Sequence, residues 1–225
     1  MTITQDLIPK GRKNRPGFQN PMNYITIHNT GNSSKGSNAR AHANYLKGDT
    51  AASLPVSWHY TVDDGVIYQH LPDNETAYHA GDGSGPGNKQ SIGIEICQNS
   101  DGNLLLATDN AARLCAILCT QHNISTKNIV QHNFWSGKNC PELLRANRPY
   151  SWATFLSKVA DYVNELNAPP PTPQLSPEEI TIENAHRIGI LSDKAYWLGV
   201  IRGTITAKPE FVKGLLDNAY NRIMK

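Results

Sequence analysis

Two histidines, a lysine and a cysteine supply the side chains that a metal-dependent hydrolase needs. His132, Lys138 and Cys140 lie in the run HNFWSGKNCP, and His28 lies far upstream in YITIHNT. Two imidazoles and one thiolate are ligands of a catalytic zinc ion whose fourth position is left for water. A lysine two residues before the cysteine places a cation beside that ion. The combination indicates a zinc hydrolase that acts on an amide.

A carboxylate is expected on the same surface as the first histidine. In YITIHNT, Ile25 and Ile27 alternate with polar residues, which is the period of a half-buried strand, and SIGIEIC repeats this pattern. The isoleucines are predicted to face the core, with His28 and Glu95 on the opposite face. A carboxylate within so apolar a strand is costly unless it has a function. If the two strands are sheet neighbours, Glu95 and His28 share one face.

Five sequence elements in one order resemble the type 2 family of N-acetylmuramoyl-L-alanine amidases, and most closely the endolysins of phages that infect Gram-positive bacteria. The elements are YITIHNT, SWHYTVDDGVIYQ, AYHAGDGSGPGN, SIGIEIC and QHNFWSGKNCP, between about residues 20 and 150. The resemblance implies a zinc ion held by His28, His132 and Cys140. It also implies that Glu95 and Lys138 are the catalytic groups, on a central mixed β-sheet flanked by helices.

Three further residues are predicted to contact substrate. His79 comes just before the loop 81–87, which contains four glycines and which, by the resemblance, borders the substrate groove. The loop lacks the Gly-Lys-Ser/Thr ending of a phosphate cradle and the spacing of a dinucleotide site, so both are rejected. Asn29 and Trp58 are candidates for the same role; some family members carry a tyrosine where this chain has Trp58. The remaining histidines are interpreted as structural: His42, His59, His70, His122 and His186.

The function that the resemblance implies is peptidoglycan hydrolysis. The bond cleaved is the amide between N-acetylmuramic acid and L-alanine, attacked by zinc-activated water, as in a phage or prophage endolysin that lyses its host. One alternative is a non-catalytic peptidoglycan receptor on the same fold, but such proteins tend to lose the cysteine ligand, present here as Cys140. Another is a Cys-His peptidase that uses Cys140 and His132, which would be insensitive to chelators.

Composition and charge exclude several other classes. The 225 residues are 39% hydrophobic and 18% charged, with a net charge of +2, too near neutral to suggest nucleic-acid binding. No segment reaches membrane-spanning length, and the first twenty residues hold no apolar run long enough for a signal peptide. We therefore expect synthesis in the cytoplasm and action on the cell wall after holin-type release or lysis. The cluster Lys10, Arg12, Lys13 and Arg15 is expected to be a solvated terminus.

A proline-rich stretch is predicted to divide the chain. Residues 168–175 are expected to form a semi-rigid spacer after a catalytic domain at 1–167. That domain is predicted to be an α/β fold, with strands near 23–29, 57–63, 65–71, 91–97 and 128–131 and helices at about 37–47, 108–122 and 151–166. Residues 176–225 are predicted to form three helices around a thin core. Such a module is expected either to bind the wall or to form a homo-oligomer.

Overall fold

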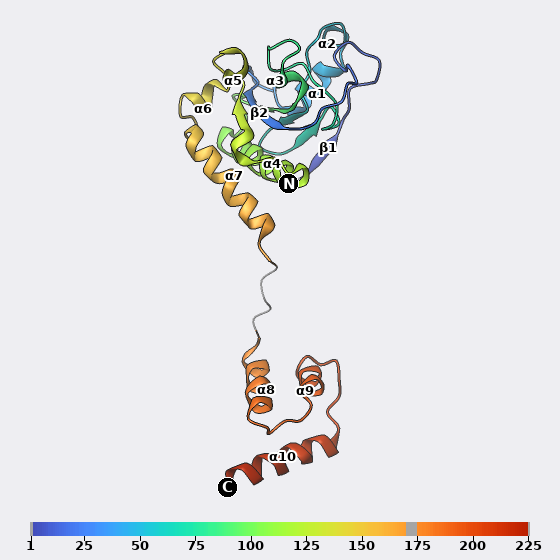
Figure 1. The fold of residues 1–225 in the computed structure, drawn as a ribbon, viewed down its shortest axis with the longest axis vertical. Helices are drawn as coiled ribbons and strands as arrows, with labels where there is room; N and C mark the ends of the chain where they lie inside the picture. Colours follow the sequence, from blue (N-terminus) through green and yellow to red (C-terminus); the bar gives the residue numbers. More distant parts are fainter. Residues whose placement is uncertain (1, 170–174, 225) are drawn as a thin grey trace. The chain divides into compact units, whose positions relative to one another are not determined.

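The computed structural model describes residues 2–169 and 175–224. The chain divides into two compact units, with the boundary between Ala168 and Pro169 (Figure 1). Most of the predicted spacer, residues 170–174, lies outside the described residues.

A six-stranded mixed sheet forms the centre of the first unit. Its strands are β1 (Ile3–Gln5), β2 (Tyr24–Asn29), β3 (Tyr60–Val62), β4 (Ile67–Gln69), β5 (Ser91–Ile96) and β6 (Ile129–Gln131). The spatial order is β1-β4-β3-β5-β2-β6. β3 and β4 form an antiparallel hairpin, and the other neighbouring strands are parallel. The predicted mixed sheet is confirmed; the edge strand β1 was not predicted, because three residues are too few to show a period.

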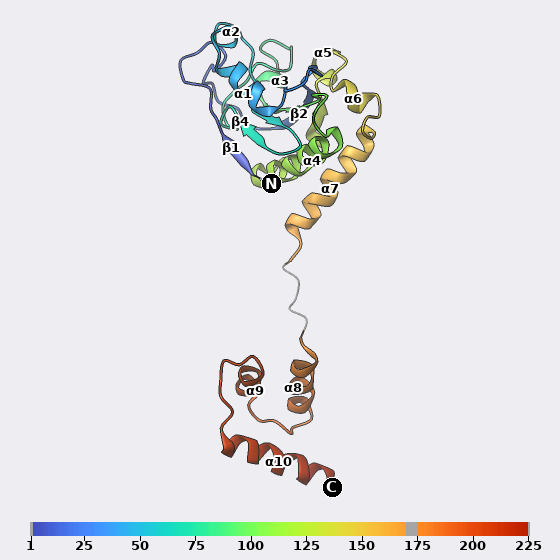
Figure 2. The same ribbon diagram turned by 180° about the vertical axis from the view of Figure 1, so that it is seen from behind.

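Helices pack on both faces of this sheet. They are α1 (Ala39–Lys47), α2 (Asp49–Ala52), α3 (Pro86–Lys89), α4 (Leu104–His122), α5 (Asn133–Ser136), α6 (Glu142–Arg145) and α7 (Trp152–Asn167), with a 3-10 turn, η1 (Thr126–Asn128). Helices α4 and α7 lie side by side (Figure 2). Leu114 and Leu118 of α4 and Phe155 of α7 share one buried cluster with the isoleucines of β2 and β5. On the other face, α1 contributes to a smaller cluster with β4.

The polar face of β2 is buried rather than solvated. Thr26 is 0% exposed and His28 is 1% exposed, so the strand is not half-buried as its alternating pattern suggested. His79, from the loop before α3, contacts His28, and Trp135 of α5 contacts Thr26. Parallel strands are ordinarily covered on both faces. The alternation therefore identifies a buried polar layer, which is where the candidate site lies.

The basic cluster near the N-terminus is not uniformly solvated, and the prediction is wrong for Arg15. This side chain is buried, and its Nε and Nη2 donate to the two carboxylate oxygens of Glu75 at 2.8 and 2.7 Å. Its Nη1 donates to the Ile8 carbonyl. A bidentate carboxylate compensates for removing the guanidinium from water. Lys10 and Lys13 are exposed, as expected.

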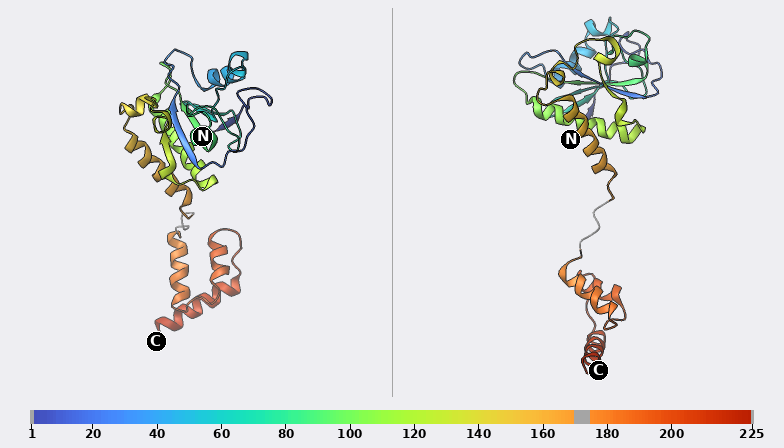
Figure 3. Two further views of the ribbon diagram at one scale, coloured as in Figure 1. Left: turned by 45° about the horizontal axis from the view of Figure 1, so that its top comes forward. Right: turned by 60° about the vertical axis from the view of Figure 1, so that its left-hand side comes forward.

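The second unit consists of α8 (Pro177–Arg187), α9 (Lys194–Ile201) and α10 (Pro209–Ile223), the three helices predicted (Figure 3). Ser176 begins α8 with a capping box: its Oγ accepts from the Glu179 amide at 3.2 Å, and the Glu179 carboxylate accepts from the Ser176 amide at 2.9 Å. Several large apolar side chains of α10 are exposed, namely Phe211, Val212, Leu216, Tyr220 and Ile223. Among the helices of residues 2–169 and 175–224, none is both long and apolar enough to cross a membrane.

Candidate metal centre

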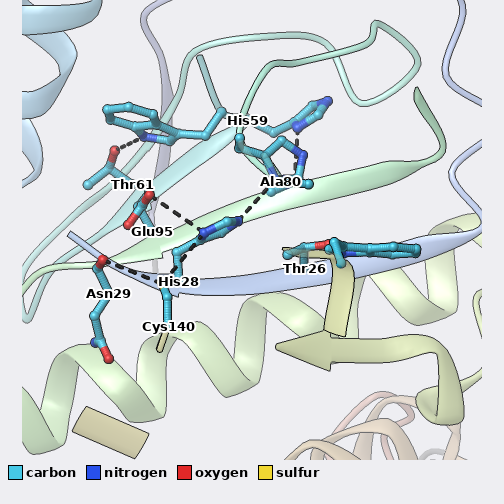
Figure 4. A network of polar contacts seen from close by, with 12 residues as sticks. Thr26, His28, Asn29, His59, Thr61, Ala80, Glu95 and Cys140 are labelled. Carbon is cyan, nitrogen blue, oxygen red and sulfur yellow. Dashed lines mark hydrogen bonds and ion pairs between the residues drawn. The ribbon is translucent and has the colours of Figure 1, made fainter. Parts of the chain in front are cut away.

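The centre begins where two neighbouring strands end. His28 of β2 and Glu95 of β5 are direct register partners, so the neighbour relation that the sequence left open is present. Because side chains alternate along a strand, both point to the face opposite the isoleucines that pack with α4. His28 Nδ1 lies 3.9 Å from Glu95 Oε1 (Figure 4). The pairing places an imidazole and a carboxylate side by side in the buried polar layer.

His132 reaches the same place from the other side of β2. It directly follows β6, which pairs in parallel with β2, and its amide donates to the Ile27 carbonyl at 3.2 Å. His132 is 5% exposed, and its ring centroid is 4.7 Å from that of His28. The last strand of the sheet therefore delivers the second imidazole.

A tight loop returns the chain to bring in the cysteine. Gly137 ends α5 with a φ of 74°, a left-handed conformation that glycine adopts readily. The Asn133 amide donates to the Cys140 carbonyl at 3.0 Å, and Asn133 Nδ2 donates to the carbonyls of Gly137 and Lys138 at 2.9 Å. Cys140 Sγ lies 3.8 Å from His28 Nδ1. The run HNFWSGKNCP is thus folded so that its histidine and its cysteine meet.

One ligand atom from each of His28, His132 and Cys140 lies within 4.8 Å of the other two. All three side chains are buried. Two polar atoms at the same place, His132 Nδ1 and Glu95 Oε2, have no hydrogen-bond partner among the described residues. A buried polar atom without a partner costs about 1–3 kcal/mol. The site thus offers two imidazoles and a thiol, and one imidazole nitrogen, His132 Nδ1, has no partner among the described residues. This donor set fits a zinc ion, which accepts nitrogen and sulfur ligands.

Burial sets the protonation states of these groups. Desolvation, reinforced by the neighbouring His79 and His132, lowers the pKa of His28 well below its usual value. Desolvation and the Lys138 ammonium lower the pKa of His132. Both imidazoles are therefore neutral and offer a lone pair. Burial raises the pKa of the Cys140 thiol to about 12 and that of Glu95 to about 8, against the opposing effect of Lys138. A bound cation would reverse the cost of the thiolate and would favour the charged carboxylate of Glu95 as well.

A cavity of about 700 Å³ opens onto this centre. Two of the three predicted substrate contacts, Trp58 and His79, line it, as does the exposed Lys138. Asn29, the third, turns elsewhere: its Oδ1 accepts a hydrogen bond from the Leu143 amide at 3.1 Å. The rest of the lining comprises His28, Pro55, Val56, Tyr78, Gly81, Gly83, Ser84, Asn88, Glu95, His132 and Ser136.

The glycine-rich loop is held by residues that the sequence did not single out. Asn88 Oδ1 accepts from the amides of His79 and Ala80 at 2.7 and 2.8 Å. Asp82 Oδ2 accepts from the amide of Gly87 in the first turn of α3 at 2.7 Å. Asp and Asn among glycines indicate turns in general, and only the fold shows which amides they bind. The loop is thereby fixed at the cavity wall.

Four of the five histidines interpreted as structural have a polar protein partner. His42 Nδ1 lies 2.8 Å from the Asn38 carbonyl oxygen. His59 Nδ1 accepts from the Gly93 amide at 2.9 Å, and His59 Nε2 donates to the Glu75 carbonyl at 2.8 Å. His70 Nε2 lies 2.8 Å from the Thr61 hydroxyl, and His122 Nε2 lies 2.7 Å from Asp73 Oδ2. These contacts agree with structural roles.

Known proteins share both the sequence and the fold of the first unit. The family model described as N-acetylmuramoyl-L-alanine amidase matches residues 18–143. N-acetylmuramoyl-L-alanine amidase XlyA of Bacillus subtilis (strain 168) is 54% identical over 144 residues, which are 64% of this chain and 48% of that protein. N-acetylmuramoyl-L-alanine amidase CwlH of the same organism is 47% identical over 161 residues, 71% of this chain and 62% of that protein. The chain thus spans less than two thirds of either relative.

Solved structures give the same result for the fold. The catalytic domain of XlyA superposes with a TM-score of 0.66 at 50% identity, covering 71% of this chain and 99% of that one. A structure of PlyL superposes with a TM-score of 0.63 at 33% identity, covering 71% and 97%. The mixed sheet with flanking helices is therefore the fold of these proteins.

Proposed function

The chain belongs to the N-acetylmuramoyl-L-alanine amidase family, and we propose that it is a zinc-dependent peptidoglycan hydrolase. Its substrate would be the amide that joins N-acetylmuramic acid to L-alanine in the bacterial wall. The observation that carries the proposal is the meeting of His28, His132 and Cys140 beside Glu95, next to a cavity that His28, His132 and Lys138 line. Its biological role would be that of a phage or prophage endolysin, released to the wall through holin-type holes or by lysis.

Each part of amide hydrolysis has a residue at this centre. His28, His132 and Cys140 would hold the zinc, which when bound polarises a carbonyl and lowers the pKa of water toward about 7. The Glu95 carboxylate, with Oε2 unpartnered, is placed to take a proton and to return it to the leaving nitrogen. The exposed ammonium of Lys138 would stabilise the developing oxyanion, an interaction typically worth about 3 kcal/mol.

The two alternative functions are less well supported. A receptor on this fold would not need the thiol, yet Cys140 is present and lies 3.8 Å from His28 Nδ1. A Cys-His peptidase needs a thiol of lowered pKa, whereas burial raises that of Cys140 to about 12. The raised pKa disfavours a nucleophilic cysteine and is compatible with a ligand that ionises on binding a metal.

The second unit would assist the first at the wall. Its exposed apolar residues on α10 are suited either to binding a wall polymer or to forming a homo-oligomer. We assign it one of these two roles and no part in the chemistry.

The decisive test is digestion of purified cell walls followed by mass spectrometry of the products. The proposal expects new free amino groups on L-alanine, with sugar chains intact, and loss of activity with EDTA or phenanthroline that added zinc restores. Glu95→Gln serves as the inactive control. New reducing sugar ends, or cleavage within the peptide, would show a different reaction. Cleavage that persists after complete removal of metal would exclude the zinc mechanism.

A further inference from the structure

A third histidine contacts the candidate centre without being one of the three proposed ligands. His79 Nδ1 lies 3.0 Å from His28 Nε2, with the two rings nearly perpendicular at 84°. The other nitrogen of His28, Nδ1, faces Cys140 Sγ at 3.8 Å and Glu95 Oε1 at 3.9 Å. The two nitrogens of His28 therefore face different surroundings: Nδ1 faces Cys140 and Glu95 (Figure 4), and Nε2 faces His79.

The direction of the hydrogen bond between the two rings follows from the other partner of His79. His79 Nε2 lies 3.4 Å from Ser91 Oγ, and the Ser91 hydroxyl donates its one proton to the Gly87 carbonyl at 2.6 Å. Toward His79, Ser91 Oγ can therefore only accept. A neutral His79 then carries its proton on Nε2 and accepts at Nδ1. His28 must donate from Nε2, which leaves the lone pair of its Nδ1 directed at the centre.

The neighbouring hydrogen bonds agree with this assignment. The Trp135 indole can only donate, and it donates to Thr26 Oγ1 at 2.9 Å. Thr26 in turn lies 2.8 Å from Ser91 Oγ, which has already used its proton, so Thr26 is the donor. Trp135 belongs to α5, between His132 and Cys140. Two runs of hydrogen bonds, one from Trp135 through Thr26 and one from His28 through His79, thus meet at Ser91 Oγ, which accepts from both.

The ring of His79 is held firmly in this place. A Cβ at position 93 would lie 2.8 Å from the Cγ and Cδ2 atoms of His79, so the ring rests directly on Gly93 of β5. The His79 amide donates to Asn88 Oδ1 at 2.7 Å. A metal ligand must offer a lone pair, so His28 carries only one ring proton when it binds. The strand fixes the ring, and the loop fixes its backbone.

We propose that His79 is a positioning residue that holds His28 in the tautomer whose Nδ1 binds the metal. The inference rests on the proposed zinc site. A metal-bound histidine ordinarily donates its second N–H to a carboxylate, a backbone carbonyl or water, which fixes its orientation and tautomer. Here a neutral imidazole takes that place. His79 consequently acts through His28, and its contact with the cavity is secondary.

Two substitutions separate the two nitrogens of His79. In His79→Asn, the amide oxygen can stand near the position of Nδ1 and accept from His28. In His79→Gln, the amide group stands near the position of Nε2, and the acceptor beside His28 is lost. Loss of such a partner typically weakens metal binding about 10- to 100-fold. We expect this loss in His79→Gln and an affinity within a few-fold of the native value in His79→Asn, measured on the full chain by zinc competition against a chelating dye.

Gly93→Ala tests the same contact without removing a hydrogen-bonding group. The added methyl displaces the His79 ring, so zinc binding should weaken as it does in His79→Gln. His70→Gln is the control, because His70 is a buried histidine whose ring nitrogen faces Thr61 rather than the centre. It should lower thermal stability and leave zinc affinity unchanged.

The tautomer itself can be observed by ¹H–¹⁵N correlation spectra of the histidine rings in the zinc-loaded chain. The expected result is a protonated Nε2 and a metal-bound Nδ1 on His28. A metal-bound Nε2, or equal native affinity in the Asn and Gln variants, would overturn the role of His79 while leaving the zinc site intact. A native chain that binds no zinc would instead overturn the proposed function, and this inference with it.

Discussion

The two units of the chain differ in which side chains they bury and which they expose. In the first unit, polar side chains such as Thr26 and His59 are 0% exposed, and each has a hydrogen-bond partner from a distant part of the sequence. In the second unit, Leu216 is 62% exposed and Ile223 is 81% exposed. The first unit encloses groups that water would otherwise solvate, whereas the second exposes groups that a core would otherwise bury.

The difference shows which interactions maintain each unit. Buried polar groups in the first unit depend on partners far along the chain, so losing one partner leaves a costly unsatisfied atom. The second unit relies on local devices at helix ends, such as the capping box of Ser176 and Glu179. A catalytic centre needs the first kind of construction, because its groups must be held without solvent. A binding or association surface can be made with the second kind.

The largest effect is expected from removing a ligand. Cys140→Ser replaces the thiolate with a poor zinc ligand, so the zinc content should fall well below about one ion per chain and wall cleavage should be abolished. Metal analysis of the purified protein measures the first effect, and His28→Ala should behave alike. Full zinc occupancy in both variants would show that the ligands are others.

Substitution of the two proposed catalytic groups should leave the metal in place. Glu95→Gln should retain zinc and lose activity by about 10²-fold or more, because the proton acceptor is gone. Lys138→Ala should show a loss of similar size through the oxyanion. Turnover of a soluble muropeptide is the measurement, with zinc content as the control. Near-native turnover in Glu95→Gln would leave that residue a structural acid.

Removal of the second unit tests whether the first unit alone carries the chemistry and the second only binds the wall or associates. Residues 1–167 should bind zinc and cleave soluble muropeptides at the rate of the full chain, but should act more slowly on intact walls if a tethered binding module is lost. If α8–α10 only associate, the isolated tail should self-associate in ultracentrifugation and fail to bind wall sacculi. A tail that does neither would contradict both roles. Loss of muropeptide cleavage would mean that the tail completes the catalytic fold.

The buried ion pair of the first unit should matter far more than an exposed pair of the second. Glu75→Gln leaves the Arg15 guanidinium buried without its counter-ion and should cost about 3 kcal/mol of unfolding free energy. Lys213→Gln, which breaks the exposed pair with Asp217 on α10, should leave stability unchanged. Chemical denaturation followed by circular dichroism compares the two variants. Equal effects would remove the distinction between the units.

The same pair predicts how stability depends on pH. The hydrogen bond from Arg15 lowers the pKa of Glu75 in the folded chain, so the unfolded chain binds this proton more tightly. The stabilisation is therefore fully present above the unfolded pKa of about 4.3 and is lost as the pH falls through the lower folded value. The difference in stability between the native chain and Glu75→Gln should shrink below about pH 4. A difference independent of pH would exclude the charge as its cause.

The smallest effect is expected at the helix caps. Ser176→Ala removes the cap of α8 and should cost about 1 kcal/mol, seen as lost helicity of the second unit. Ser151→Ala removes the equivalent cap of α7, but this helix is also anchored by the buried Phe155 and Val159. Its helicity should persist, with only a small fall in the melting temperature. Similar loss of helix in both variants would show that packing does not protect α7.

The sequence by itself determined the features that lie within a few residues of one another. The capping box at Ser176, the hairpin between β3 and β4 and the apolar face of α7 are each set by neighbours along the chain, and the structure contains all three. The site residues His28, Glu95, His132, Lys138 and Cys140 were found through residue type and family resemblance. Their roles remain proposals, and the structure brings His28, Glu95, His132 and Cys140 together, with Lys138 at the same cavity.

Only the tertiary structure decided how distant segments meet. That β5 lies beside β2, that Arg15 is buried against Glu75, and that His79 is directed at His28 Nε2 all depend on pairings across many residues. From the sequence, His79 was predicted to contact substrate. A histidine before a glycine-rich loop has the same local pattern whether it contacts substrate or positions another histidine. Hydrogen bonds and burial are properties of atoms in space, and the chain neighbours of a residue do not specify which remote partner will occupy its polar atoms.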